Sequence, residues 1–166
     1  YIINIKVIQS DWRVVGMCKE CEIITLENLY KNGEEVKLWV KKDSTPKTPF
    51  KYDIGYVTTK NETVVQHIYG GVIGTKEKYA KKLYLVKCNV CGAISSKVES
   101  HINEYGCGVC GCKLVYRGIN DIWTTQPKLG ELLLNKEDGY KYPNKSNLKL
   151  DFVCQDCGCT LNRQIC

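Results

Sequence analysis

Short apolar runs that each end in a C-x-x-C pair are the main hydrophobic pattern of the chain. WRVVGM, LYLV and LKLDFV lead into the pairs Cys18/Cys21, Cys88/Cys91 and Cys154/Cys157. The residues four positions before the first cysteine of each pair are Val14, Tyr84 and Leu150. A short apolar run bounded by turn residues predicts a strand. We therefore expect three weak copies of one unit, in which a strand leads into a tight cysteine turn.

A helix-like stretch that stops at glycine follows each of the first two pairs. TLENLYKNG covers residues 25–33 and VESHINEYG covers residues 98–106, so that Gly33 matches Gly106. A glycine just past the last helical residue is a common helix end, and each stretch therefore predicts a short helix. The complete unit is then a strand, a cysteine turn, a strand, a short helix and a second cysteine turn.

Four cysteines of the middle copy have the spacing of a metal site. Fifteen residues separate the pairs Cys88/Cys91 and Cys107/Cys110, and two such turns brought together give the four thiolates that Zn²⁺ takes in closed structural sites. Gly92 and Gly111 follow the pairs, where the turn needs a backbone free to take positive φ. Two disulfides are the rival interpretation, but the count of 11 cysteines is odd and the chain is long for a disulfide framework. The sequence therefore predicts Zn²⁺ on this quartet.

The other two copies are incomplete. Glu34 and Lys37 occupy the places of the second pair in the first copy, and the third copy reaches Cys166 before a second pair. We expect the first copy to bind no zinc through its own residues, and its fold to rest on Trp12, Val14, Ile24, Leu29 and Trp39.

Cys18/Cys21 and Cys154/Cys157 remain as half-sites, for which three interpretations stay open. They form one composite site across the chain, or Cys154, Cys157, Cys159 and Cys166 share one metal, or the partners of the third copy lie beyond residue 166. We favour the last interpretation. Cys112 and Cys159 each follow a pair in a C-G-C sequence and are expected to be spare thiols.

The segment from Gly118 to Phe152 has a different pattern. Thr124 or Thr125 is expected to cap a helix whose first turn holds Pro127. The apolar face of this helix is formed by Leu129, Leu132 and Leu133, with Leu134 as a weaker member. Asn120 and Asp121 precede Trp123 and are expected to hold a loop through side-chain to backbone hydrogen bonds.

Composition and charge narrow the class of protein. The 166 residues are 43% hydrophobic and 25% charged, as in globular chains, and the formal net charge is +6. One filled Zn(Cys)₄ site would lower this charge to +4, a mildly basic balance that fits either a solvated surface or nucleic-acid binding. The sequence contains no 18-residue apolar run and no recognisable signal peptide, which favours a cytoplasmic protein.

Catalysis by this chain is not expected. The only histidines are His67 and His101, and no hydrolase, phosphate-loop or H-x-x-x-H motif occurs. A closed cysteine quartet leaves no open position for water, which makes it a structural site.

Three motifs carry a resemblance to a known family. G-x-N-D-x-W-T-T-x-P at 118–127, N-x-E-D-G-Y-K-Y at 135–142 and S-N-x-K-x-D-F-x-C-x-x-C-G at 146–158 resemble zinc-ribbon (treble-clef-like) repeats of phage and bacterial proteins. Such repeats are common in the DNA-recognition arms of phage homing endonucleases, ahead of a very-short-patch-repair-like nuclease domain. The resemblance covers residues 50–166 well and 1–49 loosely. It implies metal ligands at the Cys88 quartet and one cysteine turn at Cys154 and Cys157.

The resemblance and the patterns together imply a small α+β fold of tandem zinc-ribbon repeats, built from short antiparallel strands and short helices. Its segments are a degenerate repeat at 1–49, a complete Cys₄ repeat at 50–117, and a helix-hairpin segment with an incomplete third turn at 118–166. We expect a double-stranded DNA partner, in the bacterial host of a phage or mobile element. The candidate DNA contacts are Lys97, Asn103, Lys113, Arg117, Asn120, Thr124, Thr125, Lys128, Lys145, Asn147 and Lys149.

A protein adaptor that grips a host protein is the alternative function, because zinc ribbons serve both purposes on one fold. Aromatic residues are enriched at the energetic centres of protein contacts. The residues available for this role are Tyr105, Tyr116, Trp123, Tyr140 and Tyr142.

Overall fold

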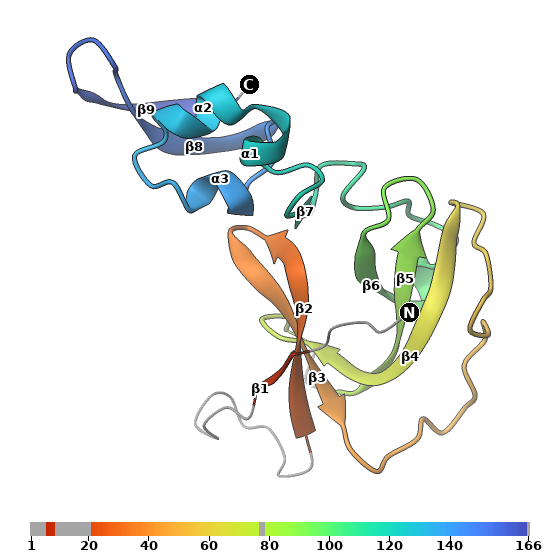
Figure 1. The fold of residues 1–166 in the computed structure, drawn as a ribbon. Helices are drawn as coiled ribbons and strands as arrows, with labels where there is room; N and C mark the ends of the chain where they lie inside the picture. The colour runs from red at the N-terminus through yellow and green to blue at the C-terminus, as the bar shows by residue number, and fades with distance from the viewer. Residues whose placement is uncertain (1–5, 9–20, 77–78, 166) are drawn as a thin grey trace. The chain divides into compact units, whose positions relative to one another are not determined.

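A computed structural model describes residues 6–8, 21–76 and 79–165, which form a small, mostly β structure with three short helices (Figure 1). This agrees with the expected small α+β class. In chain order the elements are β1 (Lys6–Ile8), β2 (Cys21–Lys31), β3 (Glu34–Lys41), β4 (Glu62–Val72), β5 (Lys81–Cys88), β6 (Ile94–Val98), the 3₁₀ turn η1 (Glu99–His101), β7 (Val115–Tyr116), α1 (Ile122–Thr125), α2 (Pro127–Leu132), α3 (Asp138–Lys141), β8 (Ser146–Val153) and β9 (Thr160–Ile165). None of the described helices is long and apolar enough to cross a lipid bilayer.

The chain divides into two compact units. Unit 1 comprises Tyr1–Glu27 and Glu35–Cys107, and unit 2 comprises Asn28–Glu34 and Gly108–Cys166. The division into three segments at 1–49, 50–117 and 118–166 stays a prediction.

Strands β1 to β6 follow one another in chain order in a curled antiparallel sheet (Figure 1, red to green). Within unit 2, β7 pairs with the end of β2, where Leu29 lies opposite Tyr116. The longest pairing joins β4 to β5 from Glu62↔Cys88 to Gly70↔Lys81, with one irregularity between Val64 and Gln66. This register places the end of β5, where the first cysteine of the quartet stands, against the start of β4.

The helix predicted at residues 25–33 is wrong, because most of this stretch belongs to β2. Asn32 and Gly33 have φ values of 53° and 82° and form the two-residue turn to β3. An Asn-Gly pair between two extended runs is a strong hairpin signal, and it outweighs the interpretation of Gly33 as a helix end. The helix predicted at residues 98–106 is likewise wrong, because Val98 ends β6 and only the 3₁₀ turn η1 is helical. Gly106 has no positive φ.

The core of unit 1 lies between the sheet and the loop that precedes β4. Val64, Tyr84, Val86 and Ile102 are fully buried, and three aromatic side chains of the loop pack against them, namely Phe50, Tyr52 and Tyr56. Of the residues expected to support the first copy, Ile24 and Leu29 are buried and Trp39 is half-buried. Trp12 and Val14 lie outside the described residues.

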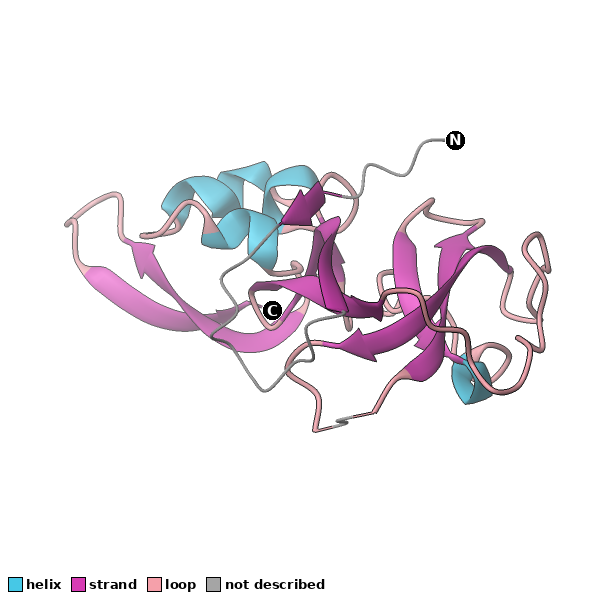
Figure 2. Cartoon of the chain, turned by 90° about the horizontal axis from the view of Figure 1, so that it is seen from below, coloured by secondary structure: helices cyan, strands magenta, loops and turns pink. Residues whose placement is uncertain are grey.

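Unit 2 packs its three helices against the β8–β9 hairpin (Figure 2). Its core consists of Ile122, Leu133, Leu150, Phe152 and Ile165. Leu129 and Leu132 are partly buried against this core, which confirms the predicted apolar face, whereas Leu134 is 53% exposed.

The predicted helix cap in this unit is wrong in one respect. The helix that holds Pro127 is α2, and its N-cap is Gln126, without a side-chain cap hydrogen bond, rather than Thr124 or Thr125. Both threonines instead lie in α1, whose N-cap is Asp121, and the Asp121 carboxylate accepts a hydrogen bond from the Thr124 N–H at 3.0 Å. A carboxylate at this position satisfies one of the unpaired N–H groups of the first helical turn. Pro127 begins the separate helix α2, where its fixed φ and missing N–H are tolerated.

Candidate metal centre

The first cysteine turn of the quartet is built by the end of β5. The Cys88 N–H donates to the Ala93 carbonyl and the Gly92 N–H donates to the Cys88 carbonyl, both at 2.9 Å. Gly92 has a φ of 77°, as the sequence predicts, because the turn needs a left-handed residue directly after the second cysteine. The turn thereby places Cys88 and Cys91 side by side.

The second turn has a different geometry. The Cys112 N–H donates to the Val109 carbonyl at 3.1 Å, and the Lys113 N–H donates to the Gly108 carbonyl at 2.8 Å. Cys112 takes the positive φ of 52°, so the expectation of a left-handed Gly111 is wrong. Cys112 thus supplies the left-handed residue of this turn through its backbone.

The four sulfurs of the quartet converge. Cys88, Cys91, Cys107 and Cys110 each offer one sulfur, and all four sulfurs lie within 4.8 Å of one another. The Cys91 and Cys107 sulfurs, which belong to different pairs, are 3.7 Å apart. In a regular tetrahedron with metal–sulfur bonds of about 2.3 Å the sulfurs are about 3.8 Å apart. The quartet can therefore hold a tetrahedral metal ion, which confirms the predicted gathering of these cysteines.

The protonation of Cys88 is biased toward the thiolate. Burial alone would raise the pKa of this thiol, but hydrogen bonds from the N–H groups of Cys91 and Val90, and from the neighbouring thiols, together hold the pKa below its ordinary value. Metals bind the thiolate form of cysteine, so a thiol that loses its proton easily suits a ligand.

A third cysteine turn at Cys154 and Cys157 repeats the first. The Cys154 N–H donates to the Cys159 carbonyl and the Gly158 N–H donates to the Cys154 carbonyl, again both at 2.9 Å. Gly158 has a φ of 73°. Hydrogen bonds from the N–H and the thiol of Cys159 hold the pKa of Cys157 below its ordinary value.

This third turn is not part of a complete site within the described chain. The Cys88 quartet is the only group of three or more potential metal ligands that gathers among residues 6–8, 21–76 and 79–165. Cys159 therefore does not complete a three-ligand cluster with Cys154 and Cys157. Cys18 and Cys166 lie outside the described residues, so the interpretations that involve them stay predictions.

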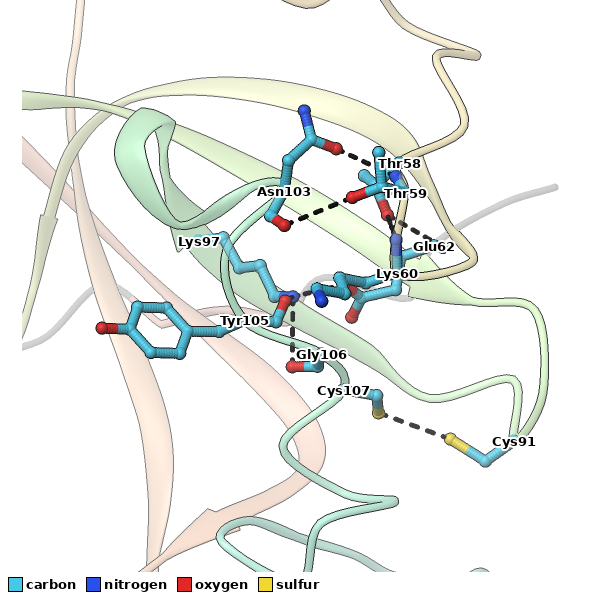
Figure 3. Close-up of polar contacts among 10 residues, drawn as sticks. All are labelled: Thr58, Thr59, Lys60, Glu62, Cys91, Lys97, Asn103, Tyr105, Gly106 and Cys107. Carbon is cyan, nitrogen blue, oxygen red and sulfur yellow. Dashed lines mark hydrogen bonds and ion pairs between the residues drawn. The ribbon is translucent and has the colours of Figure 1, made fainter.

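A buried ion pair that the sequence did not predict lies near two cysteines of the quartet, Cys91 and Cys107 (Figure 3). Lys97 on β6 is 9% exposed, and its ammonium group contacts the carboxylate of Glu62 on β4, which is fully buried. Lys97 also donates to the carbonyls of Tyr105 and Gly106, at 2.6 and 3.2 Å. The local sequence does not single out this pair, because β4 and β6 both contain other polar residues.

Lys97 is therefore wrong as a candidate DNA contact, because its charge is buried and paired. Three further candidates have hydrogen bonds within the protein. Asn103 accepts from the Thr59 N–H at 2.9 Å. Asn120 accepts from the Tyr116 N–H and donates to the carbonyls of Val109 and Leu114, which confirms its expected loop-holding role. The Thr124 hydroxyl donates to Asp121.

The remaining candidate DNA contacts all lie in unit 2 and are exposed, and two of them also have hydrogen bonds within the protein. The Thr125 hydroxyl donates to the Asp121 carbonyl, and the Asn147 side chain accepts from Gln164 at 3.1 Å. The Arg117 guanidinium lies over the Tyr140 ring at 4.0 Å from its centre. The charged residues that stay available to a ligand are Lys113, Arg117, Lys128, Lys145 and Lys149.

No protein-family model and no curated protein matches the chain, so these comparisons do not assign it to a family. The resemblance to zinc-ribbon repeats stays a prediction.

Proposed function

We propose that the chain is a zinc-stabilised DNA-binding module, built from tandem zinc-ribbon-like repeats and without catalytic activity of its own. The observation that supports the metal is the convergence of the four sulfurs of the Cys88 quartet. Four thiolates in a closed tetrahedral arrangement favour Zn²⁺ as a structural ion, with iron as the other common occupant of such sites.

Two observations support the repeat interpretation. The β5–β6 and β8–β9 hairpins close on the same hydrogen bonds around a C-x-x-C-G turn. Their registers also agree, since Lys87 pairs with Ile94 beside the first turn and Val153 pairs with Thr160 beside the third. We infer that Cys154 and Cys157 form half of a second metal site, whose other ligands lie outside the described residues.

Duplex DNA is the partner that the charges support. Five of the candidate DNA contacts are exposed cationic side chains of unit 2 that are available for phosphates, and phosphate contacts supply most non-specific affinity for DNA. Thiolate ligands that are not oxidised to disulfides also require a reducing compartment, which fits the bacterial cytoplasm, where a phage or mobile-element protein would meet DNA.

A gel-shift titration of the zinc-loaded chain at about 50 mM salt tests this function, because non-specific binding alone is visible under such conditions. The proposal expects a complex at micromolar protein with any duplex. Absence of a complex, together with capture of a specific host protein, would instead support the adaptor function. Tyr105, which is 49% exposed, and Val90, which is 75% exposed at the tip of the first turn, offer apolar surface for that alternative.

A further inference from the structure

The Lys97–Glu62 pair connects the two cysteine turns of the quartet. Glu62 lies directly opposite Cys88 in the pairing of β4 with β5. Tyr105 and Gly106, whose carbonyls accept from Lys97, are the two residues that precede Cys107. The Lys97 ammonium therefore joins the strand beside the first turn to the chain that enters the second (Figure 3).

All three donors of the ammonium group are used in this connection. A lysine side chain carries three N–H bonds and no acceptor, and Lys97 directs them to one Glu62 oxygen and to two carbonyls. The two carbonyls belong to residues outside any strand or helix. The backbone hydrogen bonds of the preceding stretch are long, at 3.4 Å from the Ile102 N–H to Glu99 and 3.3 Å from the Tyr105 N–H to His101.

Fold stability alone is a poor explanation for this pair. Removing two charges from water costs several kcal/mol per ion, so a buried pair often contributes no more than apolar side chains of similar size. The second oxygen of Glu62, Oε1, is buried without a hydrogen-bond partner in the described structure, which adds to the cost. What the pair supplies, and apolar side chains would not, is a fixed position for the Tyr105 and Gly106 carbonyls.

We infer that Lys97, held by Glu62, is a positioning residue for the metal centre, and that it fixes the distance between the two cysteine turns. This inference rests on the proposed function, since it presumes that the quartet binds a metal. Groups that orient metal ligands commonly change metal affinity about 10–100-fold when they are replaced. Lys97 acts in this way on the backbone that carries Cys107, without contacting the metal.

Competition with a chelator tests the inference on the full chain. Lys97→Met should lower Zn²⁺ affinity about 10–100-fold. Lys82→Met is the matched control. Lys82 stands on β5 of the same sheet and forms an ion pair with Glu99 at 2.7 Å, but it lies at the end of β5 that is far from Cys88. It should leave the affinity unchanged. A Lys97→Met chain with wild-type affinity would overturn the inference, whereas a wild-type chain that binds no metal would overturn the proposed function itself.

A charge swap separates positioning from simple charge pairing. Glu62→Lys combined with Lys97→Glu restores an ion pair, but a glutamate at position 97 has no N–H to offer the Tyr105 and Gly106 carbonyls. We therefore expect the swap to bind Zn²⁺ as weakly as Lys97→Met. Recovery of wild-type affinity by the swap would contradict the positioning role.

A doubly apolar variant covers the case in which the single variant fails to fold. Glu62→Leu with Lys97→Met removes both buried charges, and such replacements are often neutral or stabilising. We expect this chain to fold with zinc in excess, to keep the weakened affinity, and to show faster amide exchange at residues 105–110 than in β5 and β6. Wild-type affinity, or an exchange increase spread evenly over the sheet, would refute the inference.

Discussion

Cys88, the last residue of β5, and Cys154, the residue directly after β8, begin their turns with the same hydrogen bonds. The N–H of each cysteine donates to the carbonyl five residues later, and its own carbonyl accepts from the N–H four residues later, all at 2.9 Å. In both turns the glycine after the second cysteine is left-handed. The first copy of this turn meets a second pair of cysteines, whereas the other joins no group of three or more potential ligands among residues 6–8, 21–76 and 79–165. Within these residues only the first turn therefore belongs to a complete metal centre.

Gly92 is expected to be required for the shape of the first turn. A Cβ at Gly92 would meet no atom within 4 Å, so Gly92→Ala tests the backbone conformation rather than packing. A left-handed alanine costs about 1–2 kcal/mol, whereas asparagine tolerates this conformation better. Urea unfolding of the metal-loaded chain should show a loss of this size for Gly92→Ala and a smaller loss for Gly92→Asn. Equal stability of all three chains would contradict the assigned conformation.

Two adjacent leucines test the core of unit 2. Leu133 is 1% exposed and Leu134 is 53% exposed. Leu133→Ala should lower the free energy of unfolding by about 2–5 kcal/mol, because it leaves a cavity between the helices and the β8–β9 hairpin. Leu134→Ala should change it by less than about 0.5 kcal/mol. Thermal or urea unfolding of the two variants checks this difference, and similar losses in both would show that the helical face is wrongly placed.

The patterns along the chain predicted the site better than the fold. The two C-x-x-C pairs indicated the quartet, since ligand spacing is a local property, and the leucines after Pro127 indicated the buried helical face. Residues 25–33 were misassigned because Gly33 was interpreted as a helix end, whereas with Asn32 it forms a hairpin turn. The Lys97–Glu62 pair joins residues 35 positions apart. Nothing in the local sequence reveals that a lysine in a short polar strand is buried.

Glu99 should contribute to stability at neutral pH and lose this contribution in acid. A hydrogen bond with Lys82, supported by the Tyr84 hydroxyl, holds the pKa of Glu99 below its ordinary value. A carboxyl whose pKa is lower in the folded state stabilises the fold above the unfolded-state pKa, near pH 4, and the stabilisation disappears as the pH falls through the folded-state pKa. Glu99→Gln should therefore narrow the stability difference between pH 7 and acid.

Glu104→Gln, at an exposed position close by, is the control for this experiment. Metal loss in acid affects wild type and both variants alike, so the comparison isolates Glu99. Unfolding curves across the acid range that coincide for wild type and Glu99→Gln would refute the assigned interaction.

DNA affinity should depend on salt through the cations of unit 2. If about five of them meet phosphates, the logarithm of affinity should fall with the logarithm of salt concentration at a slope of about −4 to −5. Lys145→Glu and Lys149→Glu, both at exposed positions, should each flatten the slope by about one unit without unfolding the chain. Lys47→Glu makes the same charge change at an exposed position of unit 1 and should leave the slope nearly unchanged. Equal effects at all three positions would indicate attraction by net charge rather than a binding face.

The metal content of the purified chain under reducing conditions tests the central claim most directly. Elemental analysis should find at least one zinc per chain, because four converging thiolates bind the ion as part of folding. Cys107→Ser should lose this zinc and unfold the region around the quartet, whereas Cys112→Ser, which removes a neighbouring thiol outside the quartet, should retain it. A wild-type chain with less than one zinc, or a Cys107→Ser chain with undiminished zinc, would contradict the account.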